Sequence, residues 1–221
     1  MAKSTVEWNQ VETVLLDMDG TLLDLNFDNH FWQVHVPLRY AELHHIDLEE
    51  SKKILFPKFR SAEGTLNWYC IDYWSSQLGM DIPKLKKEVD HLIAIHPHVV
   101  EFLEAVRETG RRLLLVTNAH VKSLEIKMEQ TQLAGHFDQI VVSHDLGYAK
   151  ESYQFWDKLK TVEPYQNSTT LLVDDSLPVL RAAQNYGIAH LLAVRKPDTQ
   201  REEKDVEEFD AINYFVDIMP G

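Results

Sequence analysis

Two pairs of aspartates follow apolar runs of the sequence. Asp17 and Asp19 come directly after the first run, and Asp174 and Asp175 come directly after a later one. Carboxylates that share one pocket repel each other unless a cation compensates, and Mg²⁺ prefers carboxylate and water oxygens as ligands. If the fold brings the two pairs together, they can form a magnesium site at which a small phosphate ester binds.

Each pair also has a simpler explanation when it is taken alone. Asp19 followed by Gly20 is typical of a tight turn, and Asp175 followed by Ser176 is typical of the start of a helix. Whether the carboxylates serve chemistry or only the backbone therefore depends on the elements that position them.

Strands and helices alternate through most of the chain. Apolar runs predict strands at residues 11–17, 112–117, 139–142, 170–173 and 190–194, and helical periodicity predicts helices at 99–109, 121–133, 152–159 and 177–186. Strands joined by single helices favour right-handed crossovers and an α/β fold with a doubly wound parallel sheet. Ligands bind beyond the carboxyl ends of such strands, where Asp17, Thr117 and Asp174 are expected to lie.

The strand pattern is interrupted between residues 22 and 96. Aromatic-rich segments with helical spacing replace it at residues 27–44, 48–59, 66–78 and 85–95. Because this insert leaves and re-enters the core between the first two strands, we expect it to cover their carboxyl ends and to close on a ligand. The expected domains are a core of residues 1–21 and 97–221 and a helical cap of residues 22–96.

Four short motifs strengthen the case for chemistry. The stretch from Val14 to Thr21 reads VLLDMDGT, Val116 to Asn118 reads VTN, Lys150 precedes a helix, and the stretch from Leu171 to Ser176 reads LLVDDS. With these motifs in this order, the sequence resembles the haloacid dehalogenase-like hydrolase superfamily over nearly its whole length. The resemblance implies the Rossmann-like core and the inserted cap of that superfamily.

The resemblance also implies a role for each acidic residue. Asp17 is expected to attack phosphorus and form an aspartyl-phosphate, while Asp19 protonates the leaving group and later deprotonates the attacking water. Mg²⁺ is expected to bind the Asp17 carboxylate, the Asp19 backbone carbonyl and Asp174. Asp175 would be a ligand through water or would orient the other ligands.

Thr117, the backbone amide of Asn118 and Lys150 are expected to hold the phosphoryl oxygens. Asp19 favours phosphate ester cleavage over carbon–halogen cleavage, because only the ester needs a proton for its leaving group. A sugar-phosphate phosphatase or mutase of the same superfamily is an alternative. A catalytically silent, phosphate-responsive regulatory or binding protein is another, although the complete set of motif residues argues against it.

Four residues of the expected cap could select the substrate: Trp32, His35, Arg39 and Arg60. Aromatic residues of the cap could stack on a flat ligand, although aromatic residues at helical spacing more often pack a small helical core. The segment of residues 30–39, HFWQVHVPLR, and the length and order of the chain are similar to bacterial GMP/IMP 5′-nucleotidases of this superfamily. That similarity implies a purine nucleoside monophosphate as the substrate.

Composition and charge argue against several classes of partner. The 22 basic and 35 acidic residues give a net charge of −13, which opposes binding to nucleic acid or to an anionic membrane. A single cysteine, Cys70, fits a reducing compartment, and the N-terminal segment lacks the apolar run of a secretory signal. We therefore expect a cytoplasmic monomer or small homo-oligomer that acts on a small phosphorylated metabolite. Residues 201–210 are expected to be a solvated helix or loop outside any binding site.

Overall fold

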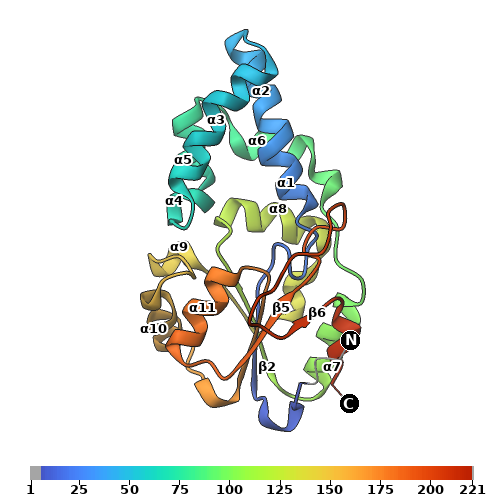
Figure 1. Ribbon diagram of the computed structural model, residues 1–221. Helices are drawn as coiled ribbons and strands as arrows, with labels where there is room; N and C mark the ends of the chain where they lie inside the picture. The colour runs from blue at the N-terminus through green and yellow to red at the C-terminus, as the bar shows by residue number, and fades with distance from the viewer. Residues whose placement is uncertain (1–5, 221) are drawn as a thin grey trace.

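Six parallel strands form the core of the molecule (Figure 1). The computed structural model describes residues 6–220, so residues 1–5 and 221 of the predicted core segments lie outside the described residues. The predicted doubly wound parallel sheet is confirmed, and only the last strand was not predicted, because two residues are too short to show a period. The sheet has the order β3-β2-β1-β4-β5-β6, with strands β1 (Thr13–Leu16), β2 (Arg112–Thr117), β3 (Gln139–Val142), β4 (Thr170–Asp174), β5 (His190–Val194) and β6 (Ala211–Ile212).

Helices cover both faces of this sheet. They are α7 (Val99–Glu108), α8 (Val121–Thr131), α9 (Ser143–Leu146), α10 (Tyr153–Val162) and α11 (Leu177–Tyr186), with short 3₁₀ turns at Trp8–Gln10, Leu133–His136, Asn167–Thr169 and Phe215–Ile218. The four predicted core helices are thereby confirmed with small shifts at their ends. Figure 1 shows α10 and α11 on one side of the sheet and α7 on the other.

The central strand β1 is buried on both faces. Its side chains alternate, so Val14 and Leu16 pack in the apolar cluster that includes α7, whereas Leu15 packs in the cluster that includes α10 and α11. Strand β1 also pairs in parallel register with β2 on one edge and with β4 on the other. The residues that follow Leu16 therefore emerge from a strand that is paired on both edges and buried on both faces.

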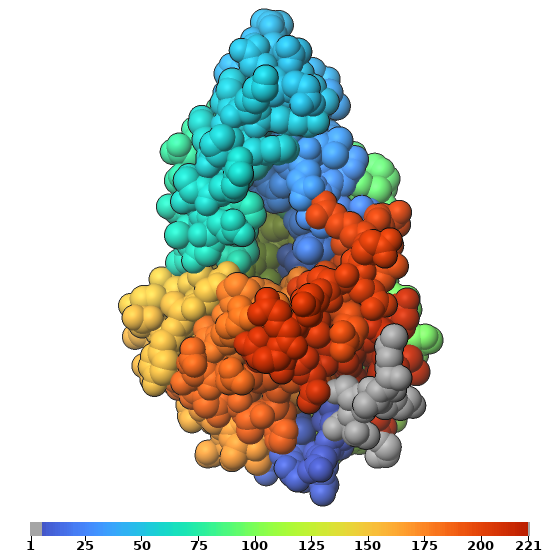
Figure 2. Space-filling view, viewed as in Figure 1, coloured from blue at the N-terminus to red at the C-terminus, as the bar shows by residue number. Residues whose placement is uncertain are grey.

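Residues 26–92 form a helical layer that lies beyond the carboxyl ends of the strands (Figure 1). Its aromatic and aliphatic side chains pack in an apolar cluster of their own, around Phe59 and Trp74. A hollow separates part of this layer from the core (Figure 2). The helices are α1 (Asn26–His30), a π-helical turn (Phe31–His35), α2 (Val36–His44), α3 (Leu48–Ala62), α4 (Leu66–Tyr69), α5 (Ile71–Leu78) and α6 (Ile82–Glu88), followed by a 3₁₀ turn (Asp90–Leu92). We call this layer the cap, and its division from the core at residues 22 and 96 stays a prediction.

The first cap helix is continuous through a π-helical turn. Segments α1, Phe31–His35 and α2 follow one another without a break in helical backbone angles. Pro37, which has no N–H to donate, is the second residue after this turn, and a widened turn is one way in which a helix accommodates a proline. No helix among residues 6–220 is both long enough and apolar enough to cross a bilayer.

A buried histidine ties the end of the cap segment to a C-terminal loop. The Nε2 atom of His96 donates a hydrogen bond to the carbonyl oxygen of Pro197 at 3.1 Å. Burial lowers the pKa of His96, and the nearby Asp24 opposes this effect only in part. The folded protein therefore binds a proton at this site less readily than the unfolded chain does.

We expect His96 to weaken folding in acid. Since its pKa is lower in the folded state, its contribution to stability is present above the ordinary histidine pKa of about 6.5 and is lost as the pH falls through the folded-state value. Glutamine retains an amide donor but does not titrate. His96→Gln should therefore make the free energy of unfolding depend less on pH between about 7.5 and 5.5. Denaturant unfolding at several pH values measures this, and an unchanged dependence would contradict it.

Candidate active site

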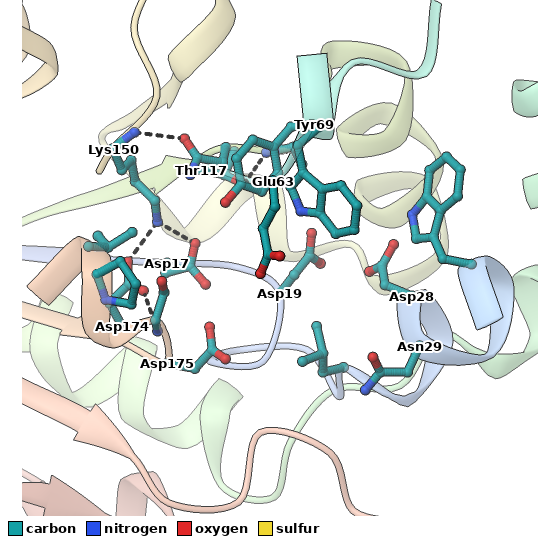
Figure 3. A pocket seen from close by; sticks show the side chains of 18 of the residues that line it. Asp17, Asp19, Asp28, Asn29, Glu63, Tyr69, Thr117, Lys150, Asp174 and Asp175 are labelled. Atoms are coloured by element: carbon teal, nitrogen blue, oxygen red, sulfur yellow. Dashed lines mark hydrogen bonds and ion pairs between the residues drawn. The ribbon is translucent and has the colours of Figure 1, made fainter. Parts of the chain in front are cut away.

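One buried lysine holds two of the predicted aspartates at the carboxyl edge of the sheet (Figure 3). Strands β1 and β4 are neighbours in register, which brings Asp17 close to Asp174. The Nζ atom of Lys150 lies 2.5 Å from Oδ1 of Asp17 and 2.7 Å from Oδ2 of Asp174, and it also donates to the carbonyl oxygen of Val116 at 3.0 Å. These contacts use all three donors of the ammonium group, so Lys150 is fixed between the two acids.

The acids at this edge carry more negative charge than Lys150 can neutralise. Burial raises the pKa of Asp17 and of Asp175 to about 6 in each case, although Lys150 and Lys204 respectively oppose the rise. Burial also raises the pKa of Asp174. Burial disfavours the charged form of Lys150 as well, but the two acids beside it raise its pKa. The site would therefore gain from a further positive charge.

Three carboxylates converge at a point where a cation could bind. One oxygen from each of Asp17, Asp174 and Asp175 can be chosen so that all lie within 4.8 Å of one another. The donors are hard oxygens with an excess of negative charge, which is the chemistry that Mg²⁺ prefers. These residues therefore fit the predicted Mg²⁺ ion. Asp17 and Asp174 are the two carboxylates expected as direct ligands, and Asp175 joins them.

Gly20 lets the backbone turn immediately behind these acids. Its φ of +85° is in the left-handed region, and a Cβ atom at this position would lie 2.8 Å from Cγ of Asp175. Asp19 and Gly20 thus form a tight turn, as their sequence alone suggests. The same turn leaves room for the side chain of Asp175.

The side chain of Asp19 points away from the acidic cluster and pairs with a different lysine. Its Oδ1 atom lies 2.5 Å from Nζ of Lys127 in α8, which lies 2.5 Å from Oδ2 of Asp28 in α1. Burial raises the pKa of Asp19 to about 6, with Lys127 acting in the opposite direction. Burial acts in the same sense on Asp28, but there Lys127 and Lys86 prevail and hold its pKa well below the usual range. The two predicted catalytic acids therefore have separate cationic partners.

Two of the three predicted phosphate-binding residues lie where β2 ends: Thr117 is its last residue and Asn118 follows it. The hydroxyl oxygen of Thr117 accepts a hydrogen bond from the backbone two residues further on, at 3.0 Å. Oδ1 of Asn118 accepts from the backbone N–H of Lys150 at 3.0 Å, and its Nδ2 donates to Glu151 at 3.0 Å. Tyr69 of the cap donates to the same carboxylate at 2.5 Å. Asn118 thus fixes the segment that carries Lys150, and Thr117 lies beside it on the cavity wall.

A cavity of about 1010 Å³ opens above these residues, between core and cap (Figure 2). Asp17, Asp19, Lys150 and Asp174 lie on its core wall. Glu63 extends into it from the end of α3 (Figure 3). The other cap residues that line it are mostly aromatic, polar or charged: Asp28, Asn29, Trp32, Gln33, Phe56, Phe59, Arg60, Trp68, Tyr69, Ile71 and Lys86.

Two of the four predicted cap residues line this cavity and two do not. Trp32 and Arg60 are part of its wall. His35 and Arg39 both bind Glu88 instead, at 3.0 Å and 2.7 Å. The structure therefore does not bring His35 and Arg39 to the cavity wall, because contacts with Glu88 hold both of them elsewhere on the cap.

The charged segment of residues 201–210 is closer to the site than expected. Val206 and Phe209 are buried against the sheet, although their neighbours are exposed. Lys204 donates to the backbone carbonyl of Asp175, and Lys204 and Glu207 line the cavity. Of the two predicted forms, helix or loop, the segment is a loop, and it borders the cavity from which it was expected to be remote. Apolar residues at irregular spacing among charges gave no periodic signal of this packing.

Two buried lysines of the site, Lys127 and Lys86, are not among the residues predicted from sequence. Both lie on the buried face of their helices, one turn after an apolar or small residue: Lys127 follows Ser123 and Leu124, and Lys86 follows Ile82. A lysine at a core position of an amphipathic helix is a signal that could have drawn attention to them.

Comparison with known proteins places the chain in a family. A family model described as haloacid dehalogenase-like hydrolase matches residues 14–193. The GMP/IMP nucleotidase YrfG of Escherichia coli strain K12 is 38% identical over 216 residues, which cover 98% of this chain and 97% of that protein. The protein of the same name from Shigella flexneri matches to the same extent.

Solved structures share the fold at low sequence identity. A HAD phosphatase from Thermococcus onnurineus has a TM-score of 0.75 and 18% identity, with 93% of this chain and 95% of that chain covered. The HAD-hydrolase YfnB of Bacillus subtilis, bound to magnesium, has a TM-score of 0.67 and 19% identity, with 92% and 95% covered.

The turn at Gly20 gives a prediction with a matched control. Alanine at Gly20 would be strained by the positive φ and would also collide with Asp175. Gly79 has a φ of +64°, but a Cβ atom at that position would face open space for at least 4 Å, so Gly79→Ala reports the backbone strain alone. We expect Gly20→Ala to lower the free energy of unfolding by about 1–3 kcal/mol and by more than Gly79→Ala does. Denaturant unfolding compares the two, and equal losses would show that the contact with Asp175 is unimportant.

Proposed function

Because this chain belongs to the haloacid dehalogenase-like hydrolase family, we propose that it is a Mg²⁺-dependent phosphomonoester hydrolase that acts on the purine nucleoside 5′-monophosphates GMP and IMP. The observation that carries the proposal is that Asp17 and Asp19 line one cavity whose opposite wall is built from aromatic residues of the cap. The identity of 38% to a GMP/IMP nucleotidase supports the choice of substrate.

In this proposal Asp17 is the nucleophile. One of its carboxylate oxygens attacks phosphorus, and the bond from phosphorus to the ester oxygen breaks, which leaves an aspartyl-phosphate and an alkoxide. Lys150 holds Asp17 in place at 2.5 Å, and Thr117 and the backbone amide of Asn118 are positioned to bind the phosphoryl oxygens. Fixed donors of this kind stabilise the charge of the transition state without reorganising.

Asp19 moves the proton in both halves of the cycle. It gives its proton to the leaving alkoxide, and it then takes a proton from the water that attacks the aspartyl-phosphate and releases inorganic phosphate. A pKa of about 6 suits this exchange near neutral pH, where both the acid and its conjugate base are populated. The carboxylate is only partly exposed, and it lines the cavity in which the ester would bind.

Asp17, Asp174 and Asp175 would hold the Mg²⁺ ion, together with the backbone carbonyl of Asp19. When bound, the ion supplies positive charge that favours ionised Asp17 and offsets the charge of the phosphoryl group. The raised pKa values of these acids support a need for such a charge.

The cap offers chemistry that suits a 6-oxopurine. Trp32, Phe59 and Trp68 provide aromatic surface on which a flat base can stack. The Arg60 guanidinium is a planar donor of the kind that binds O6 and N7 of guanine, groups that GMP and IMP share and that AMP lacks at O6. We therefore assign substrate selection to this wall of the cavity, with Arg60 as its directional contact.

Removal of the nucleophile or the metal should abolish turnover. We expect Asp17→Asn to release phosphate from GMP at least about 1,000-fold more slowly than the wild type, because an amide cannot form the covalent intermediate. EDTA should abolish wild-type activity, and added Mg²⁺ should restore it. Phosphate release measures both effects. Full activity of Asp17→Asn would disprove the assignment, and activity that EDTA leaves intact would disprove the metal requirement.

Arg60 should control selection of the base. We expect Arg60→Met to lower kcat/KM for GMP and IMP by about 10-fold or more while leaving ribose 5-phosphate nearly unaffected, because only the nucleotides offer O6 and N7. Arg39→Met is the matched control, since Arg39 is also a cap arginine but binds Glu42 and Glu88 outside the cavity. Equal losses on nucleotides and ribose 5-phosphate would contradict the role of Arg60. A wild type that prefers sugar phosphates would replace the proposed substrate with a sugar phosphate.

A further inference from the structure

Four charged side chains form a network of ion pairs that extends from the core into the cap. Asp19 contacts Lys127 at 2.5 Å, Lys127 contacts Asp28 at 2.5 Å, and Asp28 contacts Lys86 at 2.8 Å. Asp19 and Lys127 belong to the core, whereas Asp28 and Lys86 lie on the cap helices α1 and α6. Acidic and basic groups alternate along this network, so each of the two inner groups lies between two groups of opposite charge.

The ion-pair network joins Asp19, the proposed acid/base, to the cap wall of the cavity. Lys86 is 2% exposed, and its Nζ lies 4.6 Å from the ring centre of Phe31 and 5.9 Å from that of Trp32. Trp32 lines the cavity, as Asp19 does at the other end. A ligand on the cap wall therefore contacts Trp32, which packs beside Lys86 at the cap end of the ion-pair network. Asp19 is the other end of the same network.

Lys127 links the core half of this ion-pair network to the cap half. It is 1% exposed and binds one carboxylate of the core and one of the cap. Without it, Asp19 and Asp28 would face each other with no cation between them, and like charges at close range repel. The Asp19 carboxylate would then be free to leave its present position.

We propose that Lys127 is a positioning residue that holds the Asp19 carboxylate. Through Asp28, it makes the position of that carboxylate depend on the position of the cap relative to the core. This inference rests on the proposed function, because the role of Asp19 as acid and base belongs to it. It predicts that proton donation to the leaving group fails when either Lys127 or its link to the cap is removed.

A second ion pair between core and cap provides the matched control. Lys122, which lies earlier on the same helix α8, binds Asp72 of α5 at 2.7 Å. Both side chains are about half exposed, and the pair does not include Asp19. Lys122→Met therefore removes a contact between core and cap without changing the partner of the acid/base.

The test compares two esters of similar size that differ in their need for a proton. Phenyl phosphate has a poor leaving group that benefits from an acid, whereas 4-nitrophenyl phosphate has a good one that leaves without it. The value of kcat/KM reports transfer to Asp17, the step at which Asp19 is the acid. A purely structural role of Lys127 would lower both values alike.

We expect Lys127→Met to lower kcat/KM for phenyl phosphate by about 100-fold and for 4-nitrophenyl phosphate by less than about 3-fold. Asp28→Asn, which keeps Lys127 and weakens its link to the cap by removing the opposite charge, should cause a smaller loss with the same dependence on the leaving group. Lys122→Met should change neither value by more than about 2-fold.

Equal losses on the two esters, or no loss on either, would overturn the inference. If Lys127→Met does not fold, Asp28→Asn decides in the same way, because its loss must also depend on the leaving group. A wild type that hydrolyses no phosphate ester would instead overturn the proposed function.

Discussion

Lys150 lies between Asp17 and Asp174, and the arrangement of the site depends on these two buried contacts. The parallel pairing of β1 with β4 brings two acids together at one edge of the sheet, where burial disfavours their charge. One lysine with three fixed hydrogen bonds holds both acids but cannot neutralise them together with Asp175. This remaining negative charge is what makes the site suited to a divalent cation and, with it, to a phosphate ester.

The same requirement for compensating charge separates the two acids that we propose to be catalytic. Asp17 and Asp19 are only two residues apart, yet the turn at Gly20 directs them to different lysines, Lys150 and Lys127. Asp17, the proposed nucleophile, is held by core residues alone. Asp19, the proposed acid/base, is held by a lysine that also binds Asp28 of the cap, so the wall proposed to meet the substrate is linked to the residue proposed to deliver a proton.

Strong local patterns made most of the fold predictable from sequence. Apolar runs such as that of β2 and amphipathic repeats such as that of α11 carry clear periods, and three of the four motifs stand where strands end. Contacts between distant segments were not predictable, because periodicity says nothing about partners. Examples are the pairing of Lys127 with Asp28, 99 positions away in the chain, and the binding of Arg39 to Glu88, which removes Arg39 from the cavity.

Identification of the phosphorylated residue would test the central claim most directly. The protein would be mixed with Mg²⁺ and substrate, quenched in acid within the first turnovers, and digested, and its peptides would be examined by mass spectrometry. Acyl phosphates survive brief exposure to acid and react with hydroxylamine, which distinguishes them from phosphoserine or phosphothreonine. We expect one hydroxylamine-sensitive phosphate, on Asp17. A phosphate on another residue, or turnover at full rate with no phosphorylated peptide at any quench time, would contradict it.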